Sequence, residues 1–131
     1  MHGHSRNKDI FIYGNNYSEN PESTRLFPFI MSKVLDSFSY EASRFSIHKS
    51  KESTARVAMW KELKIPAVYT MEASFCGPSI GKNAGLHFTT EHFMESGKKL
   101  CLALLIYCDV DVPKSLREIN QRKKKKTKNQ S

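Results

Sequence analysis

The chain has 131 residues, of which 39% are hydrophobic, and this is enough for one modest globular domain. No window holds the roughly 18 consecutive apolar residues of a membrane span, and the N-terminus lacks an apolar signal-peptide core, so we expect a soluble intracellular protein. The formal net charge is +8, but six of these charges lie in residues 122–128, and subtracting them leaves only +2 for the rest.

The basic run is compatible with a solvated tail, a nuclear-localisation signal or a patch for acidic partners. We assign residues 111–131 to a short helix followed by a basic disordered tail. The rest of the chain has few of the interleaved basic and aromatic positions of a nucleic-acid surface, so nucleic acid is not the expected partner. The three cysteines match neither a disulfide framework nor a CxxC zinc pair, and we expect them to be reduced.

Residues 9–14 form the first predicted strand. Ile10 and Ile12 lie on one face and Phe11 and Tyr13 on the other, so both faces should be covered, as in an α/β sheet. From residue 21 the apolar spacing changes to that of an amphipathic helix, with Leu26, Phe27, Ile30, Met31, Val34 and Leu35 on its apolar side. Pro28 should kink this helix or mark its first turn.

Three further elements precede the tail. Residues 43–49 alternate weakly and predict a strand, and residues 50–64 predict a helix that buries Val57, Met59, Trp60 and Leu63, with Arg56 on the opposite side. Thr89 is expected to cap a helix that runs to about residue 109. Its predicted apolar side comprises Phe93, Leu100, Leu104, Leu105 and Cys108.

Residues 67–77 form a β-branched and aromatic run between Pro66 and Gly77-Pro78, as expected of a buried strand. One carboxylate, Glu72, lies in its middle. Burying an ionised Glu costs several kcal/mol unless it is paired, hydrogen-bonded or near a cation. Either this is an edge strand with Glu72 in water, or Glu72 is paired with a Lys or Arg, or it serves a site.

Strands that alternate with helices indicate an α/β layered fold with a parallel or mixed sheet. Only about three strands can be counted, fewer than the usual four to six of an independent sheet. The sequence therefore predicts part of a larger domain.

His2-Gly3-His4 opens the chain. Alternate histidines on an extended segment point the same way, so this pair could offer one or two imidazoles to a metal. A loop or a tag-like sequence is the alternative.

Several blocks together resemble one family. The segment His2-Gly3-His4-Ser5-Arg6, the strand that ends at Gly14, residues 50–57, residues 69–77 and His87-Phe88-Thr89-Thr90 are similar to the cytosolic carboxypeptidases, the deglutamylating branch of the zinc carboxypeptidases. The resemblance runs from residue 1 to about residue 109. It implies that residues 1–110 are the C-terminal part of a catalytic domain, a partial zinc-carboxypeptidase fold with a mixed sheet flanked by helices and without its first half.

The resemblance also implies roles for individual residues. His2 matches the third ligand of a Zn²⁺ ion, and Glu72 matches the catalytic glutamate, which takes a proton from the attacking water and returns one to the leaving amine. His4 is expected to support the ligands from behind or to have a structural role, and not to be a ligand itself. Arg56 is the candidate that grips the substrate's carboxylates, and a solvated helix Arg is the alternative.

The implied function is the removal of C-terminal glutamates from acidic protein tails such as those of tubulin. The implied location is the cytosol, and the Lys/Arg tail adds the nucleus as a second expectation.

One departure limits this interpretation. The family's other two zinc ligands, a His-x-x-Glu pair, and the residues that hold the substrate's terminal carboxylate belong upstream of His2, where this chain has only Met1. His92 and Glu95 have the same spacing, but we interpret them as an exposed helix face. We therefore expect a segment that is inactive alone. The alternative is a non-catalytic, basic-tailed binding module or a pseudoenzyme remnant.

Overall fold

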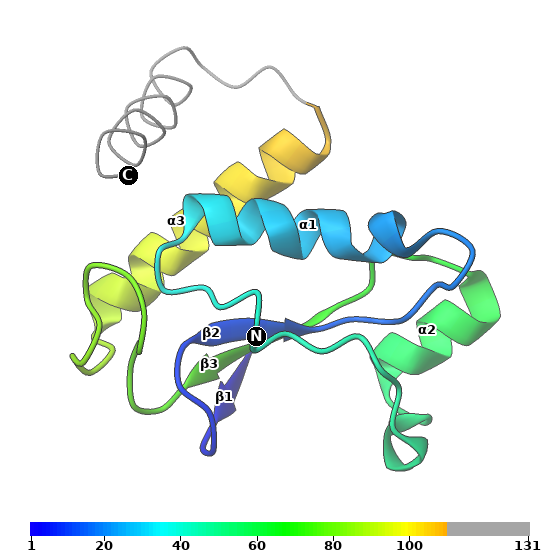
Figure 1. Cartoon of the computed structure of the whole chain (residues 1–131), viewed down its shortest axis with the longest axis horizontal. Helices are drawn as coiled ribbons and strands as arrows, with labels where there is room; N and C mark the ends of the chain where they lie inside the picture. The colour runs from blue at the N-terminus through cyan, green and yellow to red at the C-terminus, as the bar shows by residue number, and fades with distance from the viewer. Residues whose placement is uncertain (110–131) are drawn as a thin grey trace.

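A three-stranded mixed sheet organises the chain, of which this computed structural model describes residues 1–109. Strand β3 (Thr70–Ser74) lies in the centre, parallel to β1 (His2–His4) and antiparallel to β2 (Ile10–Tyr13). The other elements are helices α1 (Pro21–Val34), α2 (Ala55–Leu63) and α3 (Thr90–Tyr107) and the 3-10 turn η1 (Lys49–Lys51) (Figure 1). The predicted α/β class with a mixed sheet is confirmed, whereas the assignment of residues 111–131 lies outside the described residues.

The sheet has two faces of different composition, because successive side chains of a strand point to opposite sides. Pairing within the sheet puts Ala73 beside Ile10, and Met71 beside Ile12, on what we call the core face. The site face carries the other side chains of the three strands: His2, His4, Phe11, Tyr13, Thr70, Glu72 and Ser74.

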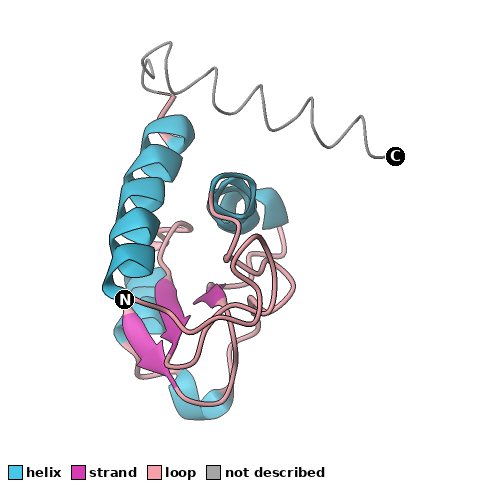
Figure 2. Ribbon diagram, turned by 90° about the vertical axis from the view of Figure 1, so that its left-hand side faces the viewer, coloured by secondary structure: helices cyan, strands magenta, loops and turns pink. Residues whose placement is uncertain are grey.

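The hydrophobic core lies between the core face and two helices. Helices α1 and α3 lie on the same side of the sheet, and α2 lies apart from them, near the end of β2 (Figures 1 and 2). The buried apolar cluster draws on all of these layers: Ile10, Ile12, Phe27, Met31, Val34, Leu35, Phe38, Ala73, Leu102 and Ala103. Strand β2 is covered on both faces as predicted, since Ile10 and Phe11 are both fully buried.

Helix α1 contains Pro28 in its interior, without a break in the helix. A proline has no N–H, so the carbonyl of Thr24, four residues earlier, loses its helical donor. The Tyr69 hydroxyl donates to this carbonyl at 3.0 Å. The bond ties α1 to the residue just before β3, and it replaces the hydrogen bond that Pro28 cannot make.

Helix α3 begins at the predicted cap. The Thr89 side chain accepts from the backbone N–H of His92, and the His92 ring accepts from the backbone N–H of Thr89, which together form a capping box. The predicted apolar side was wrong for Phe93, Leu104, Leu105 and Cys108, which are exposed. The helix is apolar on two sides, and the contact with α1 and the sheet selects the side of Ser96, Leu102 and Ala103.

Two other predictions were also wrong. Residues 43–49 form no strand, because a single isolated bridge joins Arg44 to Tyr13 and pairing does not continue. In α2, Val57 is buried as predicted, but Met59 and Leu63 are exposed and Arg56 is buried. Hydrogen bonds to the end of β2, described below, turn the Arg56 side of the helix inward.

Within residues 1–109, no helix combines the length and the apolar character required to cross a lipid bilayer.

Candidate functional site

His2 and Glu72 are direct neighbours across the sheet. The parallel register of β1 and β3 makes them Cα partners, and paired residues of adjacent strands, about 4.8 Å apart, project from the same face. The structure therefore brings together the two residues that the sequence assigned to one site. It does so although they are far apart in the chain.

Glu72 lies on the central strand and is only 9% exposed. The solvated edge strand is therefore wrong as an explanation for this carboxylate. Within residues 1–109 Glu72 is paired with no Lys or Arg, because neither of the two ion pairs there involves it and no hydrogen bond there reaches its carboxylate. No buried side-chain oxygen or nitrogen among the described residues lacks a partner, so the Glu72 carboxylate oxygens keep access to solvent, where a water molecule or a cation can reach them.

The neighbours of Glu72 leave one direction open. On the β2 side its partner is Phe11, which is fully buried. On the β1 side its partner is His2, whose side chain is exposed. A cation or water molecule that contacts Glu72 therefore has access from the side of His2.

His4 lies two residues further along β1, on the same face as His2. Its Nδ1 accepts the backbone N–H groups of Arg6 and Asn7 at 3.2 and 3.1 Å, and its ring packs edge-on against Phe11 with centroids 5.1 Å apart. These contacts occupy Nδ1 and hold the turn after β1. They show that His4 has structural contacts, while a supporting role behind the metal ligand stays a prediction.

Arg56 belongs to α2, and its side chain contacts the chain just after β2, away from Glu72. Its guanidinium donates to the Gly14 carbonyl and, at 2.8 Å, to the Asn15 side chain. Gly14 directly follows β2 and lies three residues after Phe11, the sheet partner of Glu72. Three residues of an extended chain span about 10 Å. The role of Arg56 in substrate binding therefore stays a prediction, while its structural contacts are plain.

Burial lowers the pKa of Arg56 from its ordinary value, and nearby Tyr13 acts in the opposite direction. The guanidinium stays charged at neutral pH because its ordinary pKa is so high. Asn15 is fully buried and donates to the carbonyls of Arg56 and Val68, each at 3.4 Å. Sequence analysis placed Asn15 in a loop and did not identify it as a buried residue that bonds Arg56 and Val68. Its position directly after the strand was the available signal.

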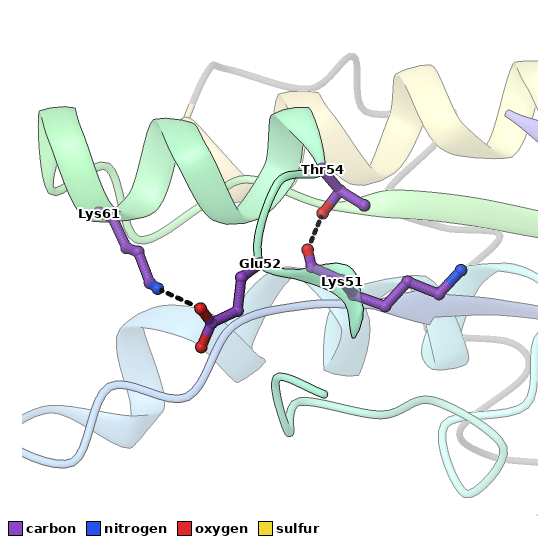
Figure 3. Close-up of polar contacts among 4 residues, drawn as sticks. All are labelled: Lys51, Glu52, Thr54 and Lys61. Carbon is purple, nitrogen blue, oxygen red and sulfur yellow. Dashed lines mark hydrogen bonds and ion pairs between the residues drawn. The ribbon is translucent and has the colours of Figure 1, made fainter. Parts of the chain in front are cut away.

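Local contacts fix the start of α2, which carries Arg56. The Thr54 hydroxyl donates to the Lys51 carbonyl at 2.7 Å, and Lys61 pairs with Glu52 at 3.4 Å (Figure 3). Both contacts fold the η1 turn back onto the helix.

A cleft lined by described residues lies elsewhere. It has a volume of about 610 Å³ and runs between the end of α1, the loop after β3 and the start of α3. His92 and Glu95 line it, but the His92 ring belongs to the capping box and Glu95 pairs with Lys99 at 3.7 Å. We place the site at His2 and Glu72 because their register and burial indicate chemistry, whereas cleft volume alone does not.

The fit of this site to a zinc ion is partial. A catalytic zinc normally has three protein ligands and one position for water. Residues 1–109 contain no cluster of three His, Cys, Asp or Glu side chains that could hold a metal. His2 fits one ligand and Glu72 fits the adjacent base, but the described residues do not complete a metal site.

Comparison with known proteins gives one consistent family. No family model matches the chain. Cytosolic carboxypeptidase 3 of Bos taurus is 41% identical over a 132-residue alignment that covers 95% of this chain. Cytosolic carboxypeptidase 2 of Danio rerio is 42% identical over 89% of the chain, and cytosolic carboxypeptidase 1 of Homo sapiens is 39% identical over 79%.

These relatives are much longer than this chain. The chain spans 13% of the bovine protein, 17% of the zebrafish protein and 10% of the human protein. Over the segment that it covers, this chain belongs to the cytosolic carboxypeptidase family.

Proposed function

We propose that this chain supplies one ligand and the general base of a zinc carboxypeptidase that removes C-terminal glutamates from acidic protein tails such as those of tubulin. The observation that carries the proposal is Glu72, which is 9% exposed and makes no ion pair or side-chain hydrogen bond within residues 1–109, beside the exposed His2. The names of the relatives support carboxypeptidase chemistry, and the preference for glutamate rests on the family resemblance.

The proposed work of Glu72 is proton transfer. Its carboxylate accepts a proton from the water that attacks the C-terminal peptide carbonyl, and it then passes a proton to the leaving amine. A base in this role must lie within about 3 Å of the water. The closed side at Phe11 supports an approach of that water from the β1 side.

The proposed work of His2 is to donate an imidazole lone pair to the metal. A zinc ion at such a site supplies polarisation of the scissile carbonyl and a nucleophilic water at neutral pH. The other ligands come from outside the described residues. We propose the cytosol as the place of this activity, because the relatives are named cytosolic, and entry into the nucleus through residues 122–128 is a separate proposal.

A chimaera tests the proposal. This chain replaces the aligned segment of mouse cytosolic carboxypeptidase 2, and release of glutamate from a peptide with a C-terminal glutamate run is measured by mass spectrometry. We expect release that stops when a chelator is added. Glu72→Gln should lower the rate by about 100- to 10,000-fold with zinc content unchanged, and His2→Ala should lower both.

Glu62→Gln is the matched control, because Glu62 is an exposed glutamate of α2 with no assigned role. Its rate should equal that of the parent chimaera. Undiminished turnover in Glu72→Gln would end the assignment of the base. Full zinc content in His2→Ala would end the assignment of the ligand.

A second candidate function is a non-catalytic binding module for acidic partners. The incomplete ligand set of residues 1–109 and the basic run at residues 122–128 favour it. It predicts no stoichiometric zinc in the chimaera. It also predicts binding to glutamate-rich peptides that weakens steeply with salt and disappears when residues 122–131 are deleted.

A further inference from the structure

One buried charge lies outside the site. Three buried residues of the described chain carry a charge: Asp9, Arg56 and Glu72. Asp9 is 6% exposed, and it takes part in neither of the two ion pairs among residues 1–109. Its carboxylate must therefore be satisfied by hydrogen bonds, and the partners show what Asp9 holds in place.

Asp9 lies where the connection between β1 and β2 passes the end of β3. The two outer strands flank β3, and β1 ends at His4, the sheet partner of Ser74, so residues 5–8 cross the C-terminal end of β3 (Figure 1). The backbone N–H of Asp9 donates to the Gly77 carbonyl at 3.1 Å, and the Asp9 carbonyl accepts the Ser74 N–H at 3.0 Å. The backbone of Asp9 therefore joins the start of β2 to the end of β3.

The carboxylate of Asp9 extends this attachment to the loop after β3. One of its oxygens accepts the backbone N–H of Ser79 at 2.5 Å, and the other accepts the Ser79 hydroxyl at 2.7 Å. Asp9 has a φ of 69°, in the left-handed region where glycine is the usual residue. An aspartate at such a position indicates that the contacts of its side chain offset the backbone strain.

The loop that receives the carboxylate is firmly packed. Pro78 is fully buried, and its carbonyl accepts the Gly85 N–H at 2.9 Å. A Cβ at Gly77 would collide with the carbonyl oxygen of Leu86, so the two ends of the loop touch. Asp9 is therefore bonded to a segment that has little room to move.

Strand β1 depends on this attachment because it is short. It has three residues, of which His2 and Gly3 are exposed. At its end, the Phe75 N–H donates to the His4 carbonyl at 2.9 Å. A strand of this length has few contacts of its own that fix its register.

We propose that Asp9 is a positioning residue, which holds the crossing against the end of β3 and thereby keeps His2 in register with Glu72. The crossing can transmit this hold because the His4 ring accepts two backbone N–H groups inside it, at 3.2 and 3.1 Å. The inference rests on the proposed function, and in it Asp9 acts only through His2.

Steady-state kinetics of the chimaera with mouse cytosolic carboxypeptidase 2, with zinc in excess, test the role in the reaction. Asp9→Gly removes the carboxylate but suits the left-handed backbone. It should lower kcat by about 10- to 100-fold with KM within about twofold, because a displacement of about 1 Å at a reacting centre has a cost of this size. Asp9→Asn should restore kcat to within about threefold of the parent, because its amide oxygen still accepts the Ser79 N–H. Leu102→Ala, a core substitution in α3, should leave kcat unchanged at a temperature at which all variants are folded.

Amide hydrogen exchange of the full 131-residue chain, followed by NMR, gives a readout without substrate or metal. The Phe75 amide reports how firmly β1 is held to β3, and the Gly14 amide, which donates to the Arg44 carbonyl at 2.8 Å, reports the other end of β2. Asp9→Gly should accelerate exchange at Phe75 at least about tenfold more than at Gly14, because the opening is local. Leu102→Ala should not raise this ratio, because it lowers the stability of the whole fold.

Three results would each overturn the positioning role of Asp9. They are an unchanged kcat in Asp9→Gly, a loss of kcat in Asp9→Asn as large as that in Asp9→Gly, and equal acceleration of exchange at Phe75 and Gly14. An inactive parent chimaera would instead overturn the proposed function, and the exchange ratio would then decide alone whether Asp9 holds β1.

Discussion

The core face and the site face share the same three strands but differ in how their polar groups are satisfied. On the core face, Ile10, Ile12 and Ala73 pack against α1 and α3, and the polar Tyr69 nearby has a hydrogen-bond partner. On the site face, Glu72 is 9% exposed, and its carboxylate has solvent access and no hydrogen-bond or ion-pair partner within residues 1–109. Alternate residues of β3 therefore belong to the hydrophobic core and to the candidate site.

The difference between the two faces indicates where a functional group can be recognised in a small fold. Buried polar groups are almost always paired, and every buried side-chain polar atom of residues 1–109 is, so a carboxylate on the central strand that keeps solvent access and has no partner there is a candidate for binding another molecule. The comparison makes definite predictions for unfolding experiments on the isolated chain, ordered below from the largest expected effect to the smallest.

Ile12→Ala should lower the free energy of unfolding by about 3 kcal/mol, because Ile12 is 1% exposed and its removal leaves a cavity against α1. Urea denaturation measures this loss. Ile12→Val should cost about 1 kcal/mol, which keeps the test usable if the alanine variant does not fold. A cost below about 1 kcal/mol for Ile12→Ala would mean that the core face is not the stabilising one.

Arg56→Ala should lower the free energy of unfolding by about 2 kcal/mol, because the Gly14 carbonyl and the Asn15 side chain lose their buried donor. Arg56→Lys should keep part of this stability. In the chimaera, Arg56→Lys also separates the two roles of this residue. A higher KM at unchanged melting temperature would favour contact with substrate over a structural role.

Tyr69→Phe should cost about 1 kcal/mol at neutral pH, because the Thr24 carbonyl loses the donor that compensates for Pro28. In a Pro28→Ala background the helix regains its own N–H at this position. The cost of Tyr69→Phe should therefore shrink there, and denaturation of the four variants measures the difference. An equal cost in both backgrounds would contradict the compensation.

Because of Tyr69, the free energy of unfolding should also depend on pH in the alkaline range. Burial raises the pKa of Tyr69 from its ordinary value near 10, and nearby Tyr107 raises it further. A raised folded-state pKa means stability that is fully present below pH 10 and is lost as the pH rises toward the folded value. Stability should fall by up to about 1 kcal/mol per pH unit above pH 10, and less steeply in Tyr69→Phe.

Glu72→Gln should leave the free energy of unfolding of the isolated chain unchanged or raise it by up to about 1 kcal/mol, because it removes a charge from a residue that is only 9% exposed and has no partner within residues 1–109. The same substitution is expected to lower activity in the chimaera, so a loss of function should not be accompanied by a loss of stability. Glu62→Gln should change neither. A loss of stability above about 1 kcal/mol in Glu72→Gln would reveal a structural partner for the carboxylate.

Local features were predictable because local chemistry decides them. The strand around Glu72, the alternation of Ile10 and Phe11, and the Thr89 cap all follow from residues close in sequence, and the structure has each of them. The failures share one cause. Residues 43–49 and the two apolar sides of α3 carry patterns that fit more than one partner, and only packing selects among them.

The sequence by itself therefore determined the class of fold, the family and the identity of the two residues that we assign to the site. Only the tertiary structure decided that His2 stands next to Glu72, because that register joins strands that are seventy residues apart and no local preference sets it. It also decided that Arg56 turns inward to β2, since buried carbonyl groups must find donors wherever the chain brings them.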